Sequence, residues 1–307
     1  MTAAIADPTD ECAGRRFAPG EHIVDDYYAV ELLGEGKRFE TWLAWSERHW
    51  CAVAVKLPHQ ASRDDRTRRS LAHEAATVSP LVHPAIQRLL DSRADAPLPY
   101  LVYEYVEGPT LDDLLDEAER LLPGDVLRLG MQIAAALRYV HDSGVVHLDL
   151  KPANVVLRDG RAVVLDFDIA RPVGARGSGV KPRGSPPFMA PEQVRCEPAA
   201  PSMDLFALGA VLYEAATGRT AFEPIGEGRD RSYPQLVAPP PRPAEIVPDL
   251  PPAVDDAIVR LLAAEPAARP ASAAAALELL AGALDDEEGL WPGWAARLLE
   301  LGKEAVP

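Results

Sequence analysis

The sequence has little cysteine and no long apolar run, and both absences restrict what the protein can be. Its three cysteines, Cys12, Cys51 and Cys196, lie far apart and form no CxxC pair. This pattern disfavours a disulfide framework or a zinc site and favours reduced thiols in a cytoplasmic protein. No apolar segment reaches the roughly 18 residues that a membrane-spanning helix needs.

Positive charge is also scarce. Lys and Arg number 31 against 47 Asp and Glu, so the formal net charge is -16. Proteins that bind nucleic acid generally need a basic surface for the phosphates, so we expect no nucleic-acid partner. The N-terminus has acids where a signal peptide has basic and then apolar residues, and we expect residues 1–22 to be a disordered leader. Nothing in the composition indicates the oligomeric state.

The first third of the chain shows strand periodicity. Residues 28–57 alternate and are rich in Val, Leu and Trp, which predicts three antiparallel strands. A helix should follow over 65–80, and two more strands over 86–91 and 100–105. A Gly-Pro pair at Gly108 then ends the pattern.

The rest of the chain is mainly helical. Apolar residues recur at helical spacing over five segments, which we expect to be helices at 111–119, 125–143, 204–217, 254–263 and 271–284. The proline-rich residues 223–252 should form an extended surface segment, and 285–307 should hold a tail helix.

Two features in the strand region have the chemistry of a phosphate site. Gly34 and Gly36, in LGEGKRFETW, lack a Cβ that would keep backbone amides away from a polyphosphate; a plain hairpin turn would also explain them. Lys56 ends the apolar run AVAVK, and a buried ammonium needs an anionic partner. Glu74, on the expected helix, suits that role, whereas an unpaired Lys56 would have to lie on the surface.

The strongest signal is the string HLDLKPANVVL, followed by VVLDFD. Asp149 can orient a hydroxyl proton, and Lys151 can neutralise a migrating phosphoryl group. Asn154 and Asp166 offer the oxygen atoms that Mg²⁺ prefers. Alone, Asp166 could equally be a turn residue at the end of a strand.

Later residues should stabilise the helical region. Glu192, in the string MAPE, and Arg269, in EPAARP, can form a buried bidentate ion pair. Asp204 can accept hydrogen bonds from the backbone of the loop around Asp149.

Taken in order, these strings resemble the signature set of the eukaryotic-type Ser/Thr protein kinases of bacteria. The resemblance covers about residues 28–280. It implies an α+β, bilobal protein kinase fold over residues 23–284. A small antiparallel β-sheet lobe with one main helix would occupy 23–105 and a larger, mainly helical lobe 106–284, with ATP between them. Lys151, two residues after the aspartate, is similar to the Ser/Thr rather than the Tyr kinases.

The resemblance also implies roles for individual residues. Asp149 would orient the hydroxyl of a protein substrate, assisted by Lys151, while Lys56, paired with Glu74, would hold the ATP phosphates. Asn154 and Asp166 would bind Mg²⁺. Tyr103 falls at the gatekeeper position beside the adenine. The implied nucleotide contacts are Gly34, Glu35, Gly36, Thr41, Ala54, Lys56, Tyr103, Glu104 and Val106.

The sequence departs from the family pattern at several positions. Phe39 replaces the third glycine of the loop, Thr41 replaces the usual valine, and Asp168 replaces the glycine of the DFG motif. Leu148 replaces an arginine that normally docks a phosphorylated activation loop, and the only hydroxyls between Asp166 and Glu192 are Ser178 and Ser185. We therefore expect loop phosphorylation not to be the main switch.

Two other functions compete with an active protein kinase. The altered glycine loop and the DFD triplet are compatible with a pseudokinase that acts as a nucleotide-binding scaffold. A small-molecule kinase of the antibiotic-phosphotransferase kind is disfavoured by Lys151 and by the APE segment, since that group usually lacks both.

Overall fold

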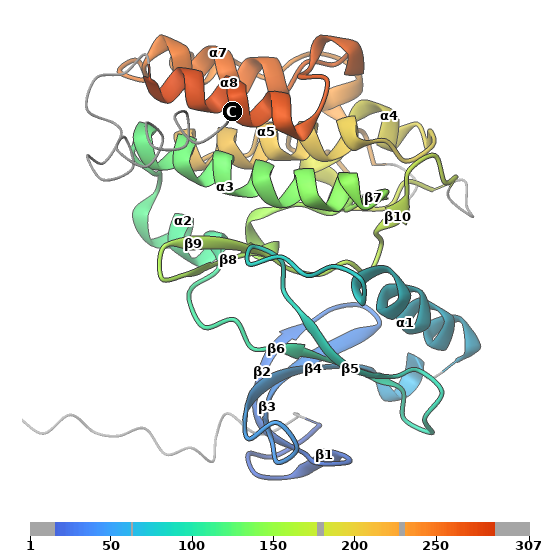
Figure 1. The fold of residues 1–307 in the computed structure, drawn as a ribbon. Helices are drawn as coiled ribbons and strands as arrows, with labels where there is room; N and C mark the ends of the chain where they lie inside the picture. Colours follow the sequence, from blue (N-terminus) through green and yellow to red (C-terminus); the bar gives the residue numbers. More distant parts are fainter. Residues whose placement is uncertain (1–15, 63, 177–180, 227–230, 286–307) are drawn as a thin grey trace, which may run out of the picture. The chain divides into compact units, whose positions relative to one another are not determined.

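The computed structural model describes residues 16–62, 64–176, 181–226 and 231–285. The chain divides into two compact units (Figure 1). Unit 1 consists of Met1–Ser79 and Arg88–Tyr105, and unit 2 of Pro80–Gln87 and Val106–Pro307. Unit 1 is built on a sheet and unit 2 mainly on helices, which makes the fold α+β, as the sequence predicts.

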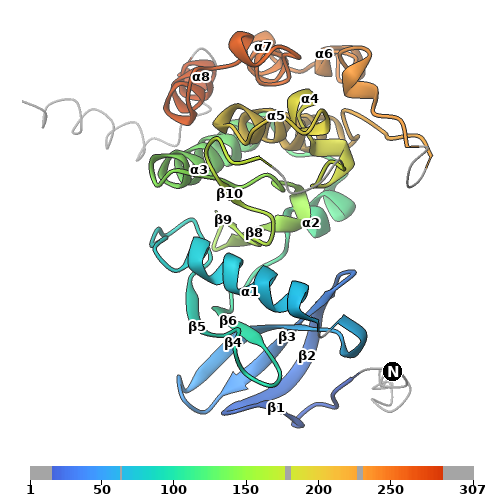
Figure 2. The ribbon, with the colours of Figure 1, turned by 90° about the vertical axis from the view of Figure 1, so that its right-hand side faces the viewer.

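Unit 1 is an antiparallel sheet in the order β1-β2-β3-β4-β6-β5, accompanied by one long helix. Its elements are β1 His22–Val24, β2 Tyr27–Glu35, β3 Phe39–Ser46, β4 Cys51–Pro58, the 3₁₀ turn Gln60–Ser62, α1 Asp65–Val78, β5 Leu89–Arg93 and β6 Tyr100–Glu104. Alternation along the strands sends Trp42, Val53 and Val55 into one apolar cluster. Helix α1 begins at its cap Asp64, whose side chain accepts a hydrogen bond from the Thr67 amide, and lies beside the sheet (Figure 2).

Unit 1 differs from the sequence prediction at two places. The strand expected over 86–91 begins only at Leu89. Ile86 belongs to unit 2, where it pairs with Val164. Residues 16–22, which we assigned to a leader, belong to the sheet unit: Phe17 packs edge-on against Trp42 with ring centroids 5.4 Å apart. Residues 1–15 of that leader lie outside the described residues.

Unit 2 is organised around α5, whose sequence is apolar nearly all round. Helix α3 packs against α5 and α8, and α5 also packs against α7 (Figure 1). The close approach of α5 and α7 requires Gly209, because a Cβ there would lie 2.7 Å from the Cβ of Leu261. The helices are α2 Leu111–Ala118, α3 Pro123–Asp142, α4 Pro191–Val194, α5 Pro201–Thr217, α6 Pro243–Ile246, α7 Pro252–Leu261 and α8 Ala273–Asp285.

Short strands and single turns complete unit 2. The strands are β7 Val145–Val146, β8 Val155–Arg158, β9 Arg161–Val164 and β10 Arg171–Pro172, and the 3₁₀ turns are Pro152–Asn154, Pro186–Phe188, Pro234–Leu236 and Pro266–Ala268. β8 pairs with β9, and β7 with β10. The β8–β9 hairpin is the element that positions the candidate site.

The proline-rich segment is more packed than we expected. It contains the 3₁₀ turn Pro234–Leu236 and α6, and both start with a proline at the first position, where no amide hydrogen is needed. Arg242 donates through Nε to Asp255 at 2.7 Å, and Val247 and Leu250 are buried. The prediction of an extended surface segment over 223–252 is therefore wrong for α6 and the residues after it, because apolar side chains between the prolines are buried.

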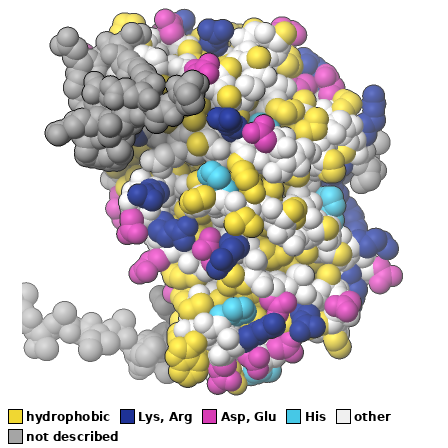
Figure 3. All heavy atoms as spheres, viewed as in Figure 1, with side chains coloured by type: hydrophobic (Ala, Val, Ile, Leu, Met, Phe, Trp, Pro, Cys, Tyr) yellow, Lys and Arg dark blue, Asp and Glu magenta, His cyan; other side chains and the backbone are white. Residues whose placement is uncertain are grey.

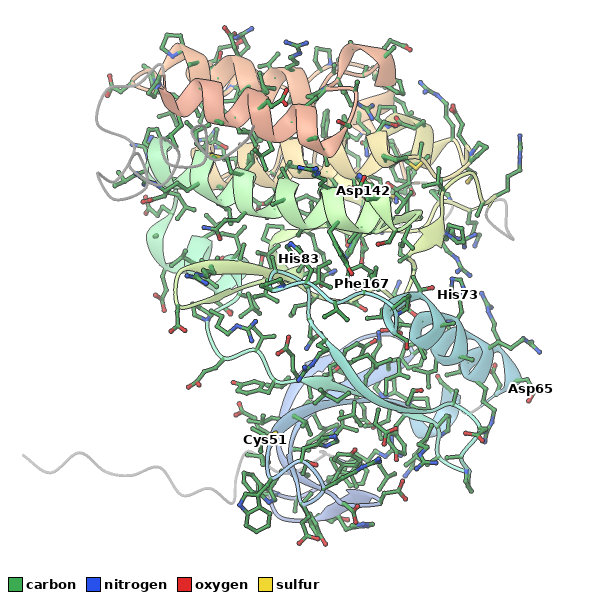
Figure 4. The ribbon with its side chains drawn as sticks, viewed as in Figure 1. Cys51, Asp65, His73, His83, Asp142 and Phe167 are labelled. Carbon is green, nitrogen blue, oxygen red and sulfur yellow. The ribbon has the colours of Figure 1, made fainter. Side chains whose placement is uncertain are left out.

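Three other expectations concern absences or the chain end. Among the described residues, no helix is both long enough and apolar enough to cross a membrane. Cys51, at the start of β4 (Figure 4), and Cys196 are free thiols, and Cys12 lies outside the described residues. The tail helix expected over 285–307 also falls almost wholly outside them.

Candidate functional site

Lys56 and Glu74 form a buried ion pair inside unit 1. Lys56 is near the end of β4, and its ammonium Nζ lies 2.9 Å from Oε1 of Glu74 on α1. The Glu74 side chain is fully buried and that of Lys56 is 10 % exposed. Two charges so buried are retained only as a pair, since removing one would leave the other uncompensated. The pairing predicted from the AVAVK run is confirmed.

A tyrosine on the neighbouring strand joins this pair. The hydroxyl of Tyr103, on β6, donates to the same Glu74 Oε1 at 2.7 Å. Tyr103 is paired with Ala54 across β4 and β6, and Leu101 with Lys56. Because side chains alternate along a strand, Lys56 and Tyr103 point to the same face of the sheet.

The glycine segment is a strand end and a turn. Gly34 lies within β2 opposite Thr41, and Gly36 follows the strand. A Cβ on Gly34 would meet nothing within 4 Å, so no packing within the protein demands glycine there. Phe39, where the family has a third glycine, is buried and places its ring centroid 5.3 Å from the Lys56 ammonium, a cation–π contact.

The segment that follows β6 leads from one unit to the other. Glu104, the last residue of β6, uses its backbone amide to bond the carbonyl of Arg88 at 2.9 Å, and its side chain accepts from the Arg88 amide. Val106 begins the next part of unit 2 and is buried in a small cluster with Val156 and Val163. Glu35 is exposed at the end of β2.

Asp204 anchors the backbone of the loop that carries Asp149. The two carboxylate oxygens of Asp204 accept the amides of His147 and Leu148, each at 2.8 Å, and Oδ2 also contacts Nε2 of His141 at 2.8 Å. Full burial opposes ionisation, but the hydrogen bond from His141 and the other bonds outweigh it and lower the pKa of Asp204. The sequence-based role of Asp204 is confirmed.

Leu148 has a left-handed backbone with φ 69°. For a bulky residue this conformation is energetically unfavourable, and such a conformation persists only where the surrounding structure fixes it. Here both backbone groups are held: the amide by Asp204 and the carbonyl by Nε2 of Gln193 at 2.7 Å. The strained residue directly precedes Asp149, so its anchoring sets the direction of that side chain.

Hairpin register brings the two candidate metal ligands together. Val155 on β8 pairs with Val164 on β9, and the next residues continue the ladder, because the Leu165 amide donates to the Asn154 carbonyl at 2.9 Å. Asp166 follows directly. The amide Nδ2 of Asn154 donates to the backbone carbonyl of Asp149 at 2.9 Å, so all three polar residues meet at one end of the hairpin.

Burial and several neighbouring groups act on the Asp149 carboxylate. Burial raises its pKa, the Lys151 ammonium opposes that shift, and the Asp166 carboxylate adds to it. Oδ1 accepts the backbone amide of Ser185 at 2.7 Å. A carboxylate held in this way can accept or orient a hydroxyl proton.

The oxygen atoms of Asn154 and Asp166 suit a hard divalent cation. One amide and one carboxylate oxygen, with further positions left for phosphate or water, match what Mg²⁺ usually takes from a protein. The hydrogen bond made by Asn154 Nδ2 fixes the orientation of its amide group. Within the described residues there is no group of three or more His, Cys, Asp or Glu that could hold a metal ion by themselves.

Sequence reasoning missed several supporting residues. Gln193 carries no chemical signal of its own, and its bonds to the Leu148 and Arg183 carbonyls depend on the folded loop. The hydroxyl contact of Tyr103 depends on strand register. The ion pair predicted between Glu192 and Arg269 is confirmed, with two bonds of 2.6 and 2.9 Å.

Comparisons with known proteins point the same way. A family model described as "Protein kinase domain" matches residues 27–279. A probable serine/threonine-protein kinase of Streptomyces coelicolor is 35 % identical over 251 residues, which cover 78 % of this chain and 37 % of that protein. The serine/threonine-protein kinase PknB of Mycolicibacterium smegmatis is 33 % identical over 285 residues, covering 89 % of this chain and 44 % of PknB.

A solved structure agrees with the fold. The crystal structure of the Mycobacterium tuberculosis PknI kinase domain superposes with a TM-score of 0.68 at 26 % identity, covering 87 % of this chain and 99 % of that one. The two curated relatives are longer proteins, and this chain spans less than half of the length of each.

Proposed function

Since this chain belongs to the bacterial-type Ser/Thr protein kinase family, we propose that it transfers the γ-phosphate of ATP to Ser or Thr hydroxyls of protein substrates. The observation that carries the proposal is the convergence of Asp149, Asn154 and Asp166 at one end of the β8–β9 hairpin, with their loop anchored on Asp204. An accidental cluster of polar groups would not need a strained, doubly anchored residue such as Leu148.

The side chains divide the work of phosphoryl transfer. Asp149 orients the substrate hydroxyl and accepts its proton, and Lys151 compensates the charge of the migrating group. Lys56, held by Glu74, contacts the ATP phosphates. Asn154 and Asp166 hold Mg²⁺, which supplies charge neutralisation at the phosphates. Positioning and electrostatics supply most of the rate enhancement in this chemistry.

We also propose which residues contact the adenine and cover the phosphates of ATP. We assign Ala54 and Tyr103 to the walls of the adenine site, and the backbones of Glu104 and Val106 to its hydrogen bonds. Gly34, Glu35, Gly36 and Thr41 cover the phosphates. These assignments follow the family resemblance position by position, and we propose the domain extent 23–284 on the same basis.

The test is phosphate incorporation with labelled Mg-ATP. Wild type should phosphorylate itself or a generic basic protein, and Asp149→Asn should lower the rate by orders of magnitude while Mg-ATP binding, measured by calorimetry, remains. Equal incorporation by both proteins would point to a contaminating kinase and reject the proposal.

A specific observation keeps a nucleotide-binding scaffold as the second candidate. The Phe39 ring lies against Lys56, at the place where the family has a glycine. A ring there narrows the space for phosphates above the lysine. If Mg-ATP binds but neither autophosphorylation nor substrate phosphorylation occurs, the scaffold function replaces the kinase function.

We further propose that phosphorylation between Asp166 and Glu192 is not the main switch. Leu148 carries no charge with which to bind a phosphate. Ser185 contacts Asp149 through its backbone amide, which an alanine retains, and its side chain also hydrogen-bonds that carboxylate, a contact that an alanine loses. Ser178 lies outside the described residues. The double variant Ser178→Ala/Ser185→Ala should keep most of the wild-type activity; loss of nearly all of it would refute this part of the proposal.

A further inference from the structure

In unit 1 the Lys56–Glu74 ion pair receives a second hydrogen-bond donor, the hydroxyl of Tyr103. Oε1 of Glu74 accepts both the Lys56 ammonium, at 2.9 Å, and the Tyr103 hydroxyl, at 2.7 Å. Glu74 is fully buried, and Tyr103 and Lys56 are 6 % and 8 % exposed. Hydrogen bonds to a buried charged group are among the stronger ones in proteins, so the hydroxyl contributes to where the carboxylate sits.

The three groups come from three different elements. Lys56 is on β4, Tyr103 on β6 and Glu74 on α1. The two strands are fixed to each other by their register, Ala54 opposite Tyr103 and Lys56 opposite Leu101. Tyr103 therefore presents its hydroxyl from a rigid ring on a rigid sheet, and α1 is the element whose position it can determine.

We propose that the Tyr103 hydroxyl is a positioning group that holds Glu74, and through it Lys56, in the arrangement needed for phosphoryl transfer. This inference rests on the proposed kinase function and specifies how its unit 1 part is kept ready. All three residues belong to unit 1.

The test uses Tyr103→Phe, which keeps the ring and removes only the hydroxyl. We expect kcat to fall by on the order of tenfold, as for the loss of one hydrogen bond to a charged group, with a smaller change in the KM for ATP. In a Glu74→Gln background the same substitution should have little further effect, because the hydroxyl acts through that carboxylate.

Tyr100→Phe is the matched control. Tyr100 lies on the same strand, is as deeply buried, and also donates its hydroxyl to a carboxylate, that of Asp25. It is three residues from Tyr103 and so points to the opposite face of the sheet. Its loss should lower stability similarly and leave kcat within about twofold of wild type.

A second readout does not depend on activity. The acetylation rate of Lys56 by a trace of acetic anhydride, followed by mass spectrometry, reports how well the ammonium is held. Tyr103→Phe should acetylate several-fold faster at Lys56 than wild type or Tyr100→Phe, with other lysines unchanged. If Tyr103→Phe does not fold, as judged by circular dichroism, Tyr103→Met replaces it.

The outcomes separate the two proposals. Faster labelling of Lys56 together with lower kcat supports the positioning role. An unchanged labelling rate, or an effect on kcat that persists in the Glu74→Gln background, overturns it. If wild type proves inactive while Lys56 labelling still responds to Tyr103→Phe, the contact is correct and the kinase function is the part that fails.

Discussion

At the scale of single residues, backbone conformation identifies which part of the DFD triplet is constrained. Asp166 has φ 58° and Leu148 φ 69°, both in the left-handed region, and such residues commonly cost about 1–3 kcal/mol each. Asp168 does not share this conformation, and its amide bonds Oδ1 of Asp166 at 3.3 Å. The adjacent Phe167 (Figure 4) is buried edge-on against His147, with centroids 4.6 Å apart. The strain therefore falls on the candidate metal ligand and not on the residue that replaces glycine.

The first prediction follows from that placement. Asp168→Gly should keep kcat within about threefold of wild type, because this conformation needs no positive φ at position 168 and surface-type changes usually have small effects. Asp166→Asn is the contrast and should lose nearly all turnover. A gain of more than tenfold in Asp168→Gly would show instead that the extra carboxylate restrains the enzyme.

At the scale of elements, one arginine joins three segments of unit 2. Arg269 donates to Glu192 of α4, to the Ser202 carbonyl of α5 at 2.8 Å, and to the carbonyls that follow α7. Its guanidinium also lies 4.9 Å from the ring of Phe206. The Arg269 side chain is 0 % exposed, so its removal would leave a buried carboxylate without its main partner.

We expect Arg269→Met to destabilise unit 2 by about 3–5 kcal/mol, the usual cost of breaking a buried pair from one side. Urea denaturation followed by fluorescence measures this change. Arg195→Met is the control, because Arg195 and Glu197 are half exposed and 4.0 Å apart, and its effect should stay below about 0.5 kcal/mol. Similar midpoints for the two variants would contradict the assignment.

A second feature at this scale is the carboxylate of Glu214, on α5. Burial, together with the acidic residues Asp112 and Asp116 of α2, raises the pKa of Glu214 to about 7 from its usual 4.5. Its Oε2 is buried and has no hydrogen-bond partner in the described part of the chain. The folded state thus favours the protonated form of Glu214 more than the unfolded state does.

The sign of the pH dependence follows. Because the folded state binds the proton more tightly than the unfolded state, Glu214 lowers stability as the pH rises from about 4.5 through about 7. Glu214→Gln cannot ionise, so its Tm should exceed that of wild type by about 2–4 °C near pH 8 and match it near pH 5. The exposed Glu265→Gln is the control; a pH-independent difference in Glu214→Gln would rule out ionisation as the cause.

Much of each element could be predicted, and the failures have physical causes. The observed helix ends differ from the predicted ones by one to three residues, as in α3, which starts at Pro123 and not at residue 125. The pairing of Lys56 with Glu74 was predictable because a buried charge demands a partner nearby. The bond from Gln193 to Leu148 was not, because a glutamine fits many surroundings and only the folded loop shows which carbonyl it meets.

At the scale of the whole molecule, the formal net charge of -16 creates a field that no local pattern describes. On the face shown in Figure 3, acidic and basic side chains are interspersed and not segregated into blocks. A net negative charge attracts cationic proteins and opposes the approach of anions.

This field predicts a salt dependence that differs between substrates. For a strongly basic protein substrate, kcat/KM should fall by about tenfold between roughly 50 and 300 mM KCl, because the Debye length shortens and steering is lost. Since salt screens the encounter and not the chemistry, kcat should change little. A neutral peptide substrate serves as the control, and its kcat/KM should stay within about twofold. A rise of kcat/KM with salt for the basic substrate would mean that local positive charge near Asp149, and not the net charge of the molecule, governs how substrate proteins approach.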